Sequence, residues 1–230
     1  MLAPFDSQTL ALCARLEKLF VPAIADVLDG MGFRNQVMGF GFSPVIPTAT
    51  LAGPAFTVRE VAAATTDPRS TEEKLRIFSE FFGAVRPGQI VIVDTGGCTA
   101  AAAWGELMST ISRFMCGARG AVVDGAIRDI SRVLKVDFPV WAKGSNPADS
   151  EGRLQLLDFD RPIRCGGVEV RPDDIVFADR DGIVVLPVGK LDVEEIVRRA
   201  EEIVALEDRS RADLRAGMPV DDVFKKYGRL

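Results

Sequence analysis

The middle of the chain alternates short apolar runs with amphipathic stretches, and this alternation constrains the fold more than any other feature. Residues 90–93 and 121–123 are continuous apolar runs, typical of strands that are buried on both faces of a sheet. A further strand is predicted over 51–59, and helices over 71–85 and 100–116, the second with a break near Gly105. Strands that are separated by helices pair in parallel through crossover connections. The pattern therefore predicts an α/β fold with helices against a parallel sheet.

The segments before this unit are predicted to be helical and then irregular. A helix is expected over 6–20, with Asp6 or Ser7 as its N-cap, and a second helical segment follows over 23–28 and ends at Gly30. Residues 31–47 are rich in Gly, Pro, Asn and Ser, which favours a loop or an irregular hairpin. Another polar turn is expected over 65–69.

Apolar spacing in the helix predicted over 71–85 places Leu75, Phe78, Phe81 and Phe82 toward the core.

The last third of the chain has a different texture. A strand is predicted over 138–143, and four short strands are expected between residues 163 and 186, separated by turn signals such as Asp181-Gly182. These four strands predict a small antiparallel or barrel-like region. From Leu191 the apolar residues recur at helical spacing beside many charged ones, which predicts a long amphipathic helix. Residues 1–230 are interpreted as a single domain in which 188–230 form a C-terminal helical arm.

Charge and hydropathy exclude several classes of partner. The net charge of −5 disfavours a nucleic-acid-binding surface, which normally carries an excess of basic residues. No run of about 18 apolar residues is present, so no membrane span is expected. The first residues lack a basic segment followed by an apolar one, so no signal peptide is expected and a cytoplasmic location is predicted.

Histidine is absent from the sequence, and this absence limits the chemistry that the chain can perform. It excludes Ser-His-Asp and Cys-His arrangements, histidine general bases and histidine metal ligands. The four cysteines are scattered without a C-x-x-C pair, which indicates neither a zinc site nor a disulfide framework. Any metal would be held by oxygen, which favours Mg²⁺ or Mn²⁺.

The strongest candidate site follows the apolar run 121–123. Asp124-Gly125 is a turn signal, and a helix is predicted to begin at Ala126, so that Arg128 and Asp129 lie together where a strand ends. Ligands of α/β proteins commonly bind outside the carboxyl ends of strands. Arg128 offers a planar fork to a carboxylate, and Asp129 is a hard oxygen ligand for a divalent ion. The competing interpretation is a solvated charge pair at the start of a helix.

A second candidate lies in the segment Gly105-Glu106-Leu107-Met108. A helix that restarts at Gly105 leaves the N–H groups of Glu106, Leu107 and Met108 free to bind a substrate carboxylate. The competing interpretation is an ordinary helix with a glycine where another element packs closely.

Three other features are weaker candidates. The cluster 179–182 is interpreted as a hairpin turn. Lys135 or Lys143 could form a Schiff base only if desolvated, and nothing in the sequence indicates that. Cys98 lies in a glycine-rich stretch, where a small residue that fills a tight loop is the favoured interpretation.

Six segments together resemble the RraA-like family, which includes the class II 4-hydroxy-4-methyl-2-oxoglutarate and 4-carboxy-4-hydroxy-2-oxoadipate aldolases. The resemblance covers roughly residues 20 to 228, and each segment alone is weakly specific. The segments are Gly53-Pro54-Ala55-Phe56-Thr57-Val58, Val85-Arg86-Pro87-Gly88, Trp104-Gly105-Glu106-Leu107-Met108, Val123-Asp124-Gly125-Ala126-Ile127-Arg128-Asp129, Pro139-Val140-Trp141-Ala142-Lys143-Gly144 and Ala178-Asp179-Arg180-Asp181-Gly182-Ile183-Val184-Val185-Leu186-Pro187.

This resemblance implies a three-layer, swivelling-domain-like α/β/α fold with a small additional β region, and homotrimers or homohexamers whose active sites lie between subunits. It implies an enzyme that uses Mg²⁺ or Mn²⁺ to release pyruvate from a 2-oxo acid, with oxaloacetate decarboxylation as a side activity. By position, Asp129 binds the metal, Arg128 steadies the pyruvate enolate, and the amides of Gly105 to Met108 hold the carboxylate. Glu106 is expected near the metal, through a water molecule.

The chain departs from the aldolase pattern at two points. Glu106 stands where aldolase members have an aspartate, and its spacing to Arg128 is one residue longer. Arg132 stands where many of those members have an acid. Two other functions therefore stay open: a non-catalytic, protein-binding regulator resembling ribonuclease inhibitors, and a different metal-dependent enzyme on the same scaffold.

Overall fold

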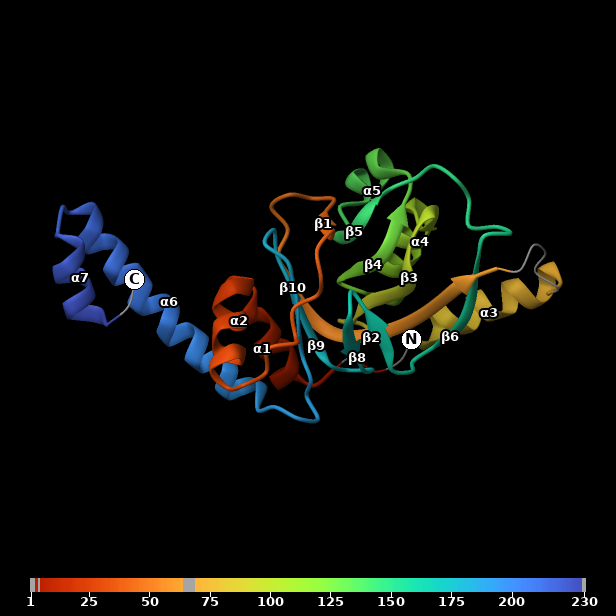
Figure 1. Ribbon diagram of the computed structural model, residues 1–230. Helices are drawn as coiled ribbons and strands as arrows, with labels where there is room; N and C mark the ends of the chain where they lie inside the picture. The colour runs from red at the N-terminus through yellow and green to blue at the C-terminus, as the bar shows by residue number, and fades with distance from the viewer. Residues whose placement is uncertain (1–2, 4, 64–68, 229–230) are drawn as a thin grey trace.

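Figure 1 shows the computed structural model, which describes residues 3, 5–63 and 69–228. The turn that was predicted over 65–69 lies outside these residues except for Arg69.

A curled mixed sheet forms the centre of the molecule. Its strands follow the order β1-β5-β4-β3-β2-β9-β10, and β6 pairs with β2. The four central strands β2 to β5 run parallel, whereas β1, β6, β9 and β10 pair in antiparallel fashion. The bounds are β1 Ser43–Pro44, β2 Leu51–Ala62, β3 Ile90–Trp104, β4 Gly120–Ile127, β5 Val140–Ser145, β6 Leu154–Phe159, β9 Ile175–Ala178 and β10 Ile183–Leu186.

Three helices, α1, α3 and α6, begin at a residue whose side chain caps them. Asp6, Ser70 and Asp192 each accept a hydrogen bond from the first turn of the helix that follows, and such caps typically contribute about 1 kcal/mol. The helices are α1 Ser7–Leu16, α2 Val21–Gly30, α3 Thr71–Ala84, α4 Glu106–Ile111, α5 Ile130–Val136, α6 Val193–Arg215 and α7 Val220–Tyr227, and the π-helix Ser112–Cys116 continues α4.

Alternate residues of the central strands face different cores. Val91 and Val93 of β3 pack with α3 and with residues 101–104, whereas Ile90 and Ile92 point to the opposite side of the sheet. On that side, the separate hairpin of β7 (Ile163–Cys165) and β8 (Val168–Val170) closes the curled sheet. A third core joins α1, α2 and the start of α6 to β9 and β10. The α/β fold class is confirmed.

The long C-terminal helix is also confirmed. The first half of α6 is packed through Ile196, Val197 and Ala200, whereas its second half extends away from the sheet, as Figure 1 shows. Helix α7 folds back on α6, where Asp213 accepts hydrogen bonds from Lys226 Nζ and Tyr227 Oη. Residues 193–227 therefore form an arm of two helices.

The predictions of a tight loop at Cys98 and of a helix that begins at residue 100 were wrong, whereas the helical part of 100–116 after Gly105 is confirmed. Strand β3 continues to Trp104 and pairs irregularly with β4, through Cys98 with Gly125 and Ala102 with Ala126. The alanine-rich run has a high helix propensity, but Ala101, Ala102 and Ala103 are buried as part of the sheet, and tertiary packing overrides propensity.

Two predictions for the last third of the chain are corrected. Only β7 and β8 form a separate small sheet, whereas β9 and β10 extend the main sheet beside β2. The hairpin turn between β9 and β10 lies at Asp181-Gly182, as predicted. Strand β6 was not predicted, because two adjacent leucines break the alternation of apolar and polar residues in its run Leu154–Phe159.

Helix α3 places only part of its predicted apolar face in the core. Phe81 is buried and Phe82 is half-buried, as predicted, but Leu75 and Phe78 are 66% and 43% exposed. With Met115 they line an open apolar groove of about 550 Å³ between α3 and the π-helix.

The remaining sequence expectations concern cysteines and membranes. All four cysteines are free, and burial raises the pKa of Cys13 to about 11 and that of Cys165 above its usual range. None of the described helices combines the length and apolarity that crossing a bilayer requires.

Candidate active site

The candidate site forms where β4 ends and α5 begins. The strand continues through Asp124 and Gly125 to Ile127, so the predicted turn at Asp124-Gly125 was wrong. Arg128 N–H donates to the carbonyl of Trp104 at 2.9 Å, which fixes the end of β4 against the end of β3. Asp129 then adopts the left-handed conformation, with φ 61° and ψ 32°, and precedes α5 without capping it through its side chain. The chain thus presents two successive charged side chains at the edge of the sheet.

Arg128 and Asp129 are close but do not form a closed ion pair. Arg128 Nε lies 3.8 Å from Asp129 Oδ2, and the side chains are 38% and 42% exposed. The closer partner of Arg128 is Asp149, whose Oδ2 accepts from Nη1 at 2.8 Å. The carboxylate of Asp129 therefore retains lone pairs for a ligand, and Arg128 retains N–H groups that could bind an anion.

The segment Gly105 to Met108 lies beside this pair. A Cβ atom at Gly105 would lie 2.9 Å from Asp129 Oδ2 and 3.3 Å from Arg128 Cγ, so glycine permits the close approach. The N–H of Glu106 lies 3.4 Å from Asp129 Oδ2, a long hydrogen bond. Helix α4 begins at Glu106, as the predicted restart after Gly105 requires.

The side chains of this segment face different surroundings. Glu106 Oε1 accepts a hydrogen bond from Thr110 Oγ1 at 2.8 Å, Leu107 is 70% exposed, and Met108 packs against the main core. The structure thus brings Gly105 and the N–H of Glu106 close to Asp129. It leaves Leu107 exposed to solvent and packs Met108 against the main core.

An open pocket of about 370 Å³ lies over the pair. Its opposite wall is the start of the loop after β5, where Asn146 Nδ2 donates to the carbonyl of Thr99 at 2.9 Å. The lining residues are Ile127, Arg128, Asp129, Ile130, Ser145, Asn146 and Pro147.

The donor set fits a hard divalent ion that is bound mainly by water and substrate. Within the ranges that the structure describes, no three acidic or cysteine side chains converge on one point. Among the described residues that line the pocket, Asp129 is the acid that could hold such an ion; the N–H of Glu106 approaches it, whereas the Glu106 carboxylate accepts from Thr110. Mg²⁺ commonly binds through one or two carboxylates and keeps several waters.

Asp124 and Lys143 form a second charged pair, which the sequence did not reveal. Lys143 Nζ lies 2.5 Å from Oδ1 of the buried Asp124, and the N–H of Gly166 donates to its Oδ2 at 2.8 Å. The ammonium also lies 5.3 Å from the centre of the Phe42 ring. The pair ties β4 and β5 to the β7–β8 hairpin, which gives Lys143 a structural role in place of a Schiff base.

Gly125 in β4 lies so close to β3 that there is no room for a side chain at this position. A Cβ atom there would lie 2.6 Å from both the carbonyl oxygen of Cys98 and Oγ1 of Thr95, because the bulged strand β3 crosses close to β4. We expect Gly125→Ala to destabilise the fold by about 3 kcal/mol, since the backbone must shift to admit the methyl group. Gly182→Ala, which meets no atom within 4 Å, is the control. Urea unfolding of the two variants measures the difference, and equal midpoints would contradict this account.

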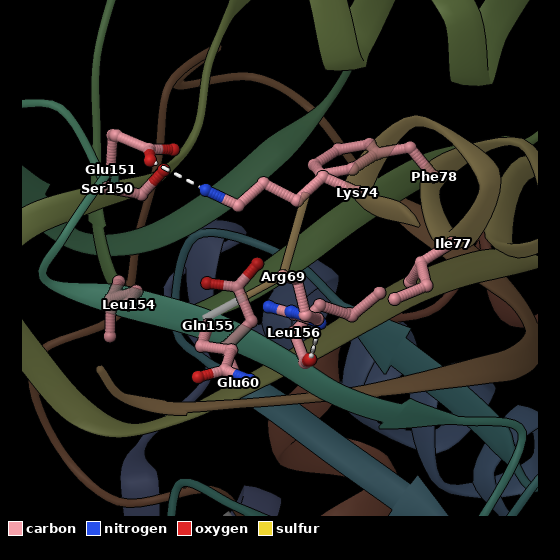
Figure 2. A pocket seen from close by; sticks show the side chains of 10 residues that line it. All are labelled: Glu60, Arg69, Lys74, Ile77, Phe78, Ser150, Glu151, Leu154, Gln155 and Leu156. Atoms are coloured by element: carbon pink, nitrogen blue, oxygen red, sulfur yellow. Dashed lines mark hydrogen bonds and ion pairs between the residues drawn. The ribbon is translucent and has the colours of Figure 1, made fainter. Parts of the chain in front are cut away.

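A second pocket lies away from Arg128 and Asp129, and Figure 2 shows it from close by. Glu60 of β2 directs its carboxyl group into this pocket, and its Oε2 is buried without a hydrogen-bond partner among the residues that the structure describes. Arg69 and Lys74 line the same pocket; Arg69 donates to the carbonyl of Leu156, and Lys74 pairs with Glu151 at 2.7 Å. Burial raises the pKa of Glu60 from its ordinary 4.5 to about 7.

Glu60 should therefore make stability depend on pH. The unfolded chain loses this proton near pH 4.5 and the folded protein near pH 7, so stability falls as the pH rises through this window. The expected loss is roughly 3 kcal/mol, because one pKa unit corresponds to about 1.4 kcal/mol. Urea unfolding at pH 5 and pH 8 should show this loss in the wild type and in the control Glu72→Gln, but not in Glu60→Gln. The same loss in all three proteins would exclude Glu60 as its source.

The fold and this site together define an α/β protein with a carboxylate and a guanidinium beside a pocket at the end of a sheet. The family model RraA-like, described as Aldolase/RraA, matches residues 21–185. The chain belongs to the RraA-like family.

Relatives that match this chain have differing names. One from Halalkalibacterium halodurans, named "Putative 4-hydroxy-4-methyl-2-oxoglutarate aldolase", is 32% identical over 78% of this chain and 77% of its own length. Protein DlpA of Legionella pneumophila is 26% identical over 89% of this chain, which spans 32% of DlpA. The chain thus covers about a third of that relative, and 60% of a relative from Pseudomonas syringae that carries the aldolase name.

Solved structures agree on the fold. RraAS2 of Streptomyces coelicolor, described as an unusual member of the RNase ES inhibitor RraA protein family, is 28% identical with a TM-score of 0.76 over 92% of this chain and 99% of its own. An uncharacterized protein from Pseudomonas syringae is 23% identical with a TM-score of 0.81 over 99% of this chain and 100% of its own, and this likeness shows the fold alone.

Proposed function

We propose that this protein is a divalent-metal-dependent lyase. It cleaves a carbon–carbon bond of a 4-hydroxy-2-oxo dicarboxylic or tricarboxylic acid to release pyruvate, and it decarboxylates oxaloacetate as a side activity. The observation that carries the proposal is the placement of Arg128 and Asp129 at one open pocket, with neither side chain buried in a closed salt link. The names of several relatives, which include 4-hydroxy-4-methyl-2-oxoglutarate aldolase, support the same reaction class.

Each residue of the site has a proposed role. Asp129 would hold Mg²⁺ or Mn²⁺, and Glu106 would be the second acid near the ion. When bound, the ion supplies a Lewis acid that polarises the 2-oxo group and offsets negative charge as the bond breaks. Arg128 binds the substrate carboxylate through its fork, and the N–H groups of Leu107 and Met108 add hydrogen bonds to the same anion. We place Arg128 and Glu106 in the catalytic machinery.

Assembly is a further part of the proposal. The pocket is open to solvent in one chain, so we propose that a homotrimer or homohexamer closes it with a neighbouring subunit. The partner is a small 2-oxo acid rather than a nucleic acid or a membrane, and we propose a cytoplasmic location.

The test is pyruvate release from oxaloacetate and from 4-hydroxy-4-methyl-2-oxoglutarate, measured by coupling to lactate dehydrogenase. Turnover above the enzyme-free rate is expected with Mg²⁺ or Mn²⁺ and should disappear on adding EDTA. No metal-dependent turnover of either acid would refute the lyase. Turnover of another 2-oxo acid in a wider screen would instead indicate a different metal-dependent enzyme on this scaffold.

A second candidate function is a protein-binding regulator. The apolar groove between α3 and the π-helix exposes Leu75, Phe78 and Met115, and exposed apolar patches often mark protein interfaces. A solved structure of similar fold belongs to the RNase ES inhibitor RraA family. A regulator of this kind needs no metal, so it should release no pyruvate in the same assay.

A further inference from the structure

Arg128 is held at the pocket by contacts on three sides. Its stem lies over Gly105, where an added Cβ would be 3.6 Å from Nε, and Nε also faces Asp129. The shortest of its charged contacts is with Asp149, from Nη1 to Oδ2 at 2.8 Å. Only one guanidinium nitrogen is within hydrogen-bond distance of this acid, so Nη2 keeps its donors for a ligand.

Asp149 is itself fixed in a charged state. Its Oδ1 accepts the N–H of Glu151 at 3.0 Å, which leaves Oδ2 for Arg128. The Glu151 N–H first and Arg128 second lower the pKa of Asp149, so the carboxylate stays ionised at neutral pH.

The loop that carries Asp149 is anchored at both ends. At its start, the N–H of Asn146 donates to the carbonyl of Ile127 at 3.0 Å, and the N–H of Ala102 donates to the carbonyl of Ala148 at 3.0 Å. At its end, the Lys74–Glu151 ion pair joins the loop to α3, as Figure 2 shows. A side chain on a loop fixed in this way can hold a neighbour in one orientation.

We propose that Asp149 is a positioning residue that orients the Arg128 guanidinium toward the carboxylate of the 2-oxo acid. This inference rests on the proposed function. The rival account is a surface ion pair, since Asp149 is 54% exposed, and such pairs contribute little to stability.

A double-mutant cycle distinguishes the two accounts. Asp149→Ala should weaken the binding of oxalate, an analogue of the pyruvate enolate, about tenfold in calorimetry with Mg²⁺, and should raise KM for oxaloacetate by a similar factor. In an Arg128→Lys background the same change should cost less than twofold, because the oriented fork is already lost. Asp149→Asn, which keeps an acceptor at this position, should recover part of the loss.

Asp208→Ala is the matched control, since it removes the acid of another exposed Asp–Arg pair, that with Arg211 on α6, which does not line the pocket. It should leave oxalate binding within twofold of the wild type. Unchanged binding in Asp149→Ala, or losses that multiply with Arg128→Lys, would overturn the positioning role. Oxalate binding also separates this result from the proposed function: a wild type that binds oxalate but turns over no 2-oxo acid refutes the lyase, and the cycle still decides the role of Asp149.

Discussion

Replacing Asp129 by alanine should abolish metal-stimulated pyruvate release, with a loss of roughly a thousandfold, because a Lewis acid contributes several kcal/mol to such a cleavage. Asp129 is the acid that lines the pocket, and its cation neighbour in the described part of the chain, Arg128, keeps Nε 3.8 Å away. The measurement is steady-state turnover of oxaloacetate over a range of Mn²⁺ concentrations. Mn²⁺ binding, followed by electron paramagnetic resonance, should weaken in parallel.

The left-handed backbone at Asp129 requires a second variant. Alanine is disfavoured at φ 61°, whereas asparagine tolerates this region and has nearly the same shape as aspartate. Asp129→Asn should therefore keep the stability of the wild type and still lose most turnover, because a neutral amide is a poorer ligand. Asp137→Asn provides the control, since Asp137 is also left-handed but does not line the pocket. Full activity in Asp129→Asn would remove Asp129 from the mechanism.

The sequence was sufficient to predict the parallel core of the sheet and the cap of the first helix at Asp6. Continuous apolar runs such as Ile90 to Val93 have few alternatives to a buried strand, and a cap such as Asp6 acts through bonds a few residues away. Residues 95–104 were predicted incorrectly because their strand depends on Gly125, which lets β3 approach β4. That contact joins residues far apart in the chain, so local propensity favours a helix instead.

In the candidate site, too, local features could be predicted from the sequence, whereas contacts between residues far apart in the chain could not. Adjacency in the chain placed Arg128 beside Asp129, and the glycine at position 105 indicated a close approach. The contact of Asp149 with Arg128 and the Asp124–Lys143 pair could not be predicted from the sequence. Lys143 meets Asp124 only when β5 pairs with β4, and Asp149 meets Arg128 only when the loop after β5 returns to the end of β4. An Asp next to polar residues in a loop carries no signal of which cation it will meet.

Arg128→Lys should reduce kcat/KM for oxaloacetate by about tenfold to a hundredfold, since a charged hydrogen bond of this kind contributes roughly 1.5–3 kcal/mol. Lysine keeps the charge but is a single point donor, so it cannot contact Asp149 and a substrate carboxylate with separate nitrogens of one planar group. Nη1 of Arg128 already donates to Asp149, so the substrate carboxylate depends on the second terminal nitrogen, Nη2.

Arg132→Lys is the control for this prediction, because Arg132 carries the same charge one helical turn along α5 and does not line the pocket. Its steady-state constants should stay within twofold of the wild type. Thermal unfolding should change little in either variant, since Arg128 is partly exposed and its ion pairs are screened by solvent. If Arg128→Lys kept the kcat and KM of the wild type, the guanidinium fork would have no part in binding the substrate, and the pocket would have to bind its acid through the backbone N–H groups near Gly105 alone.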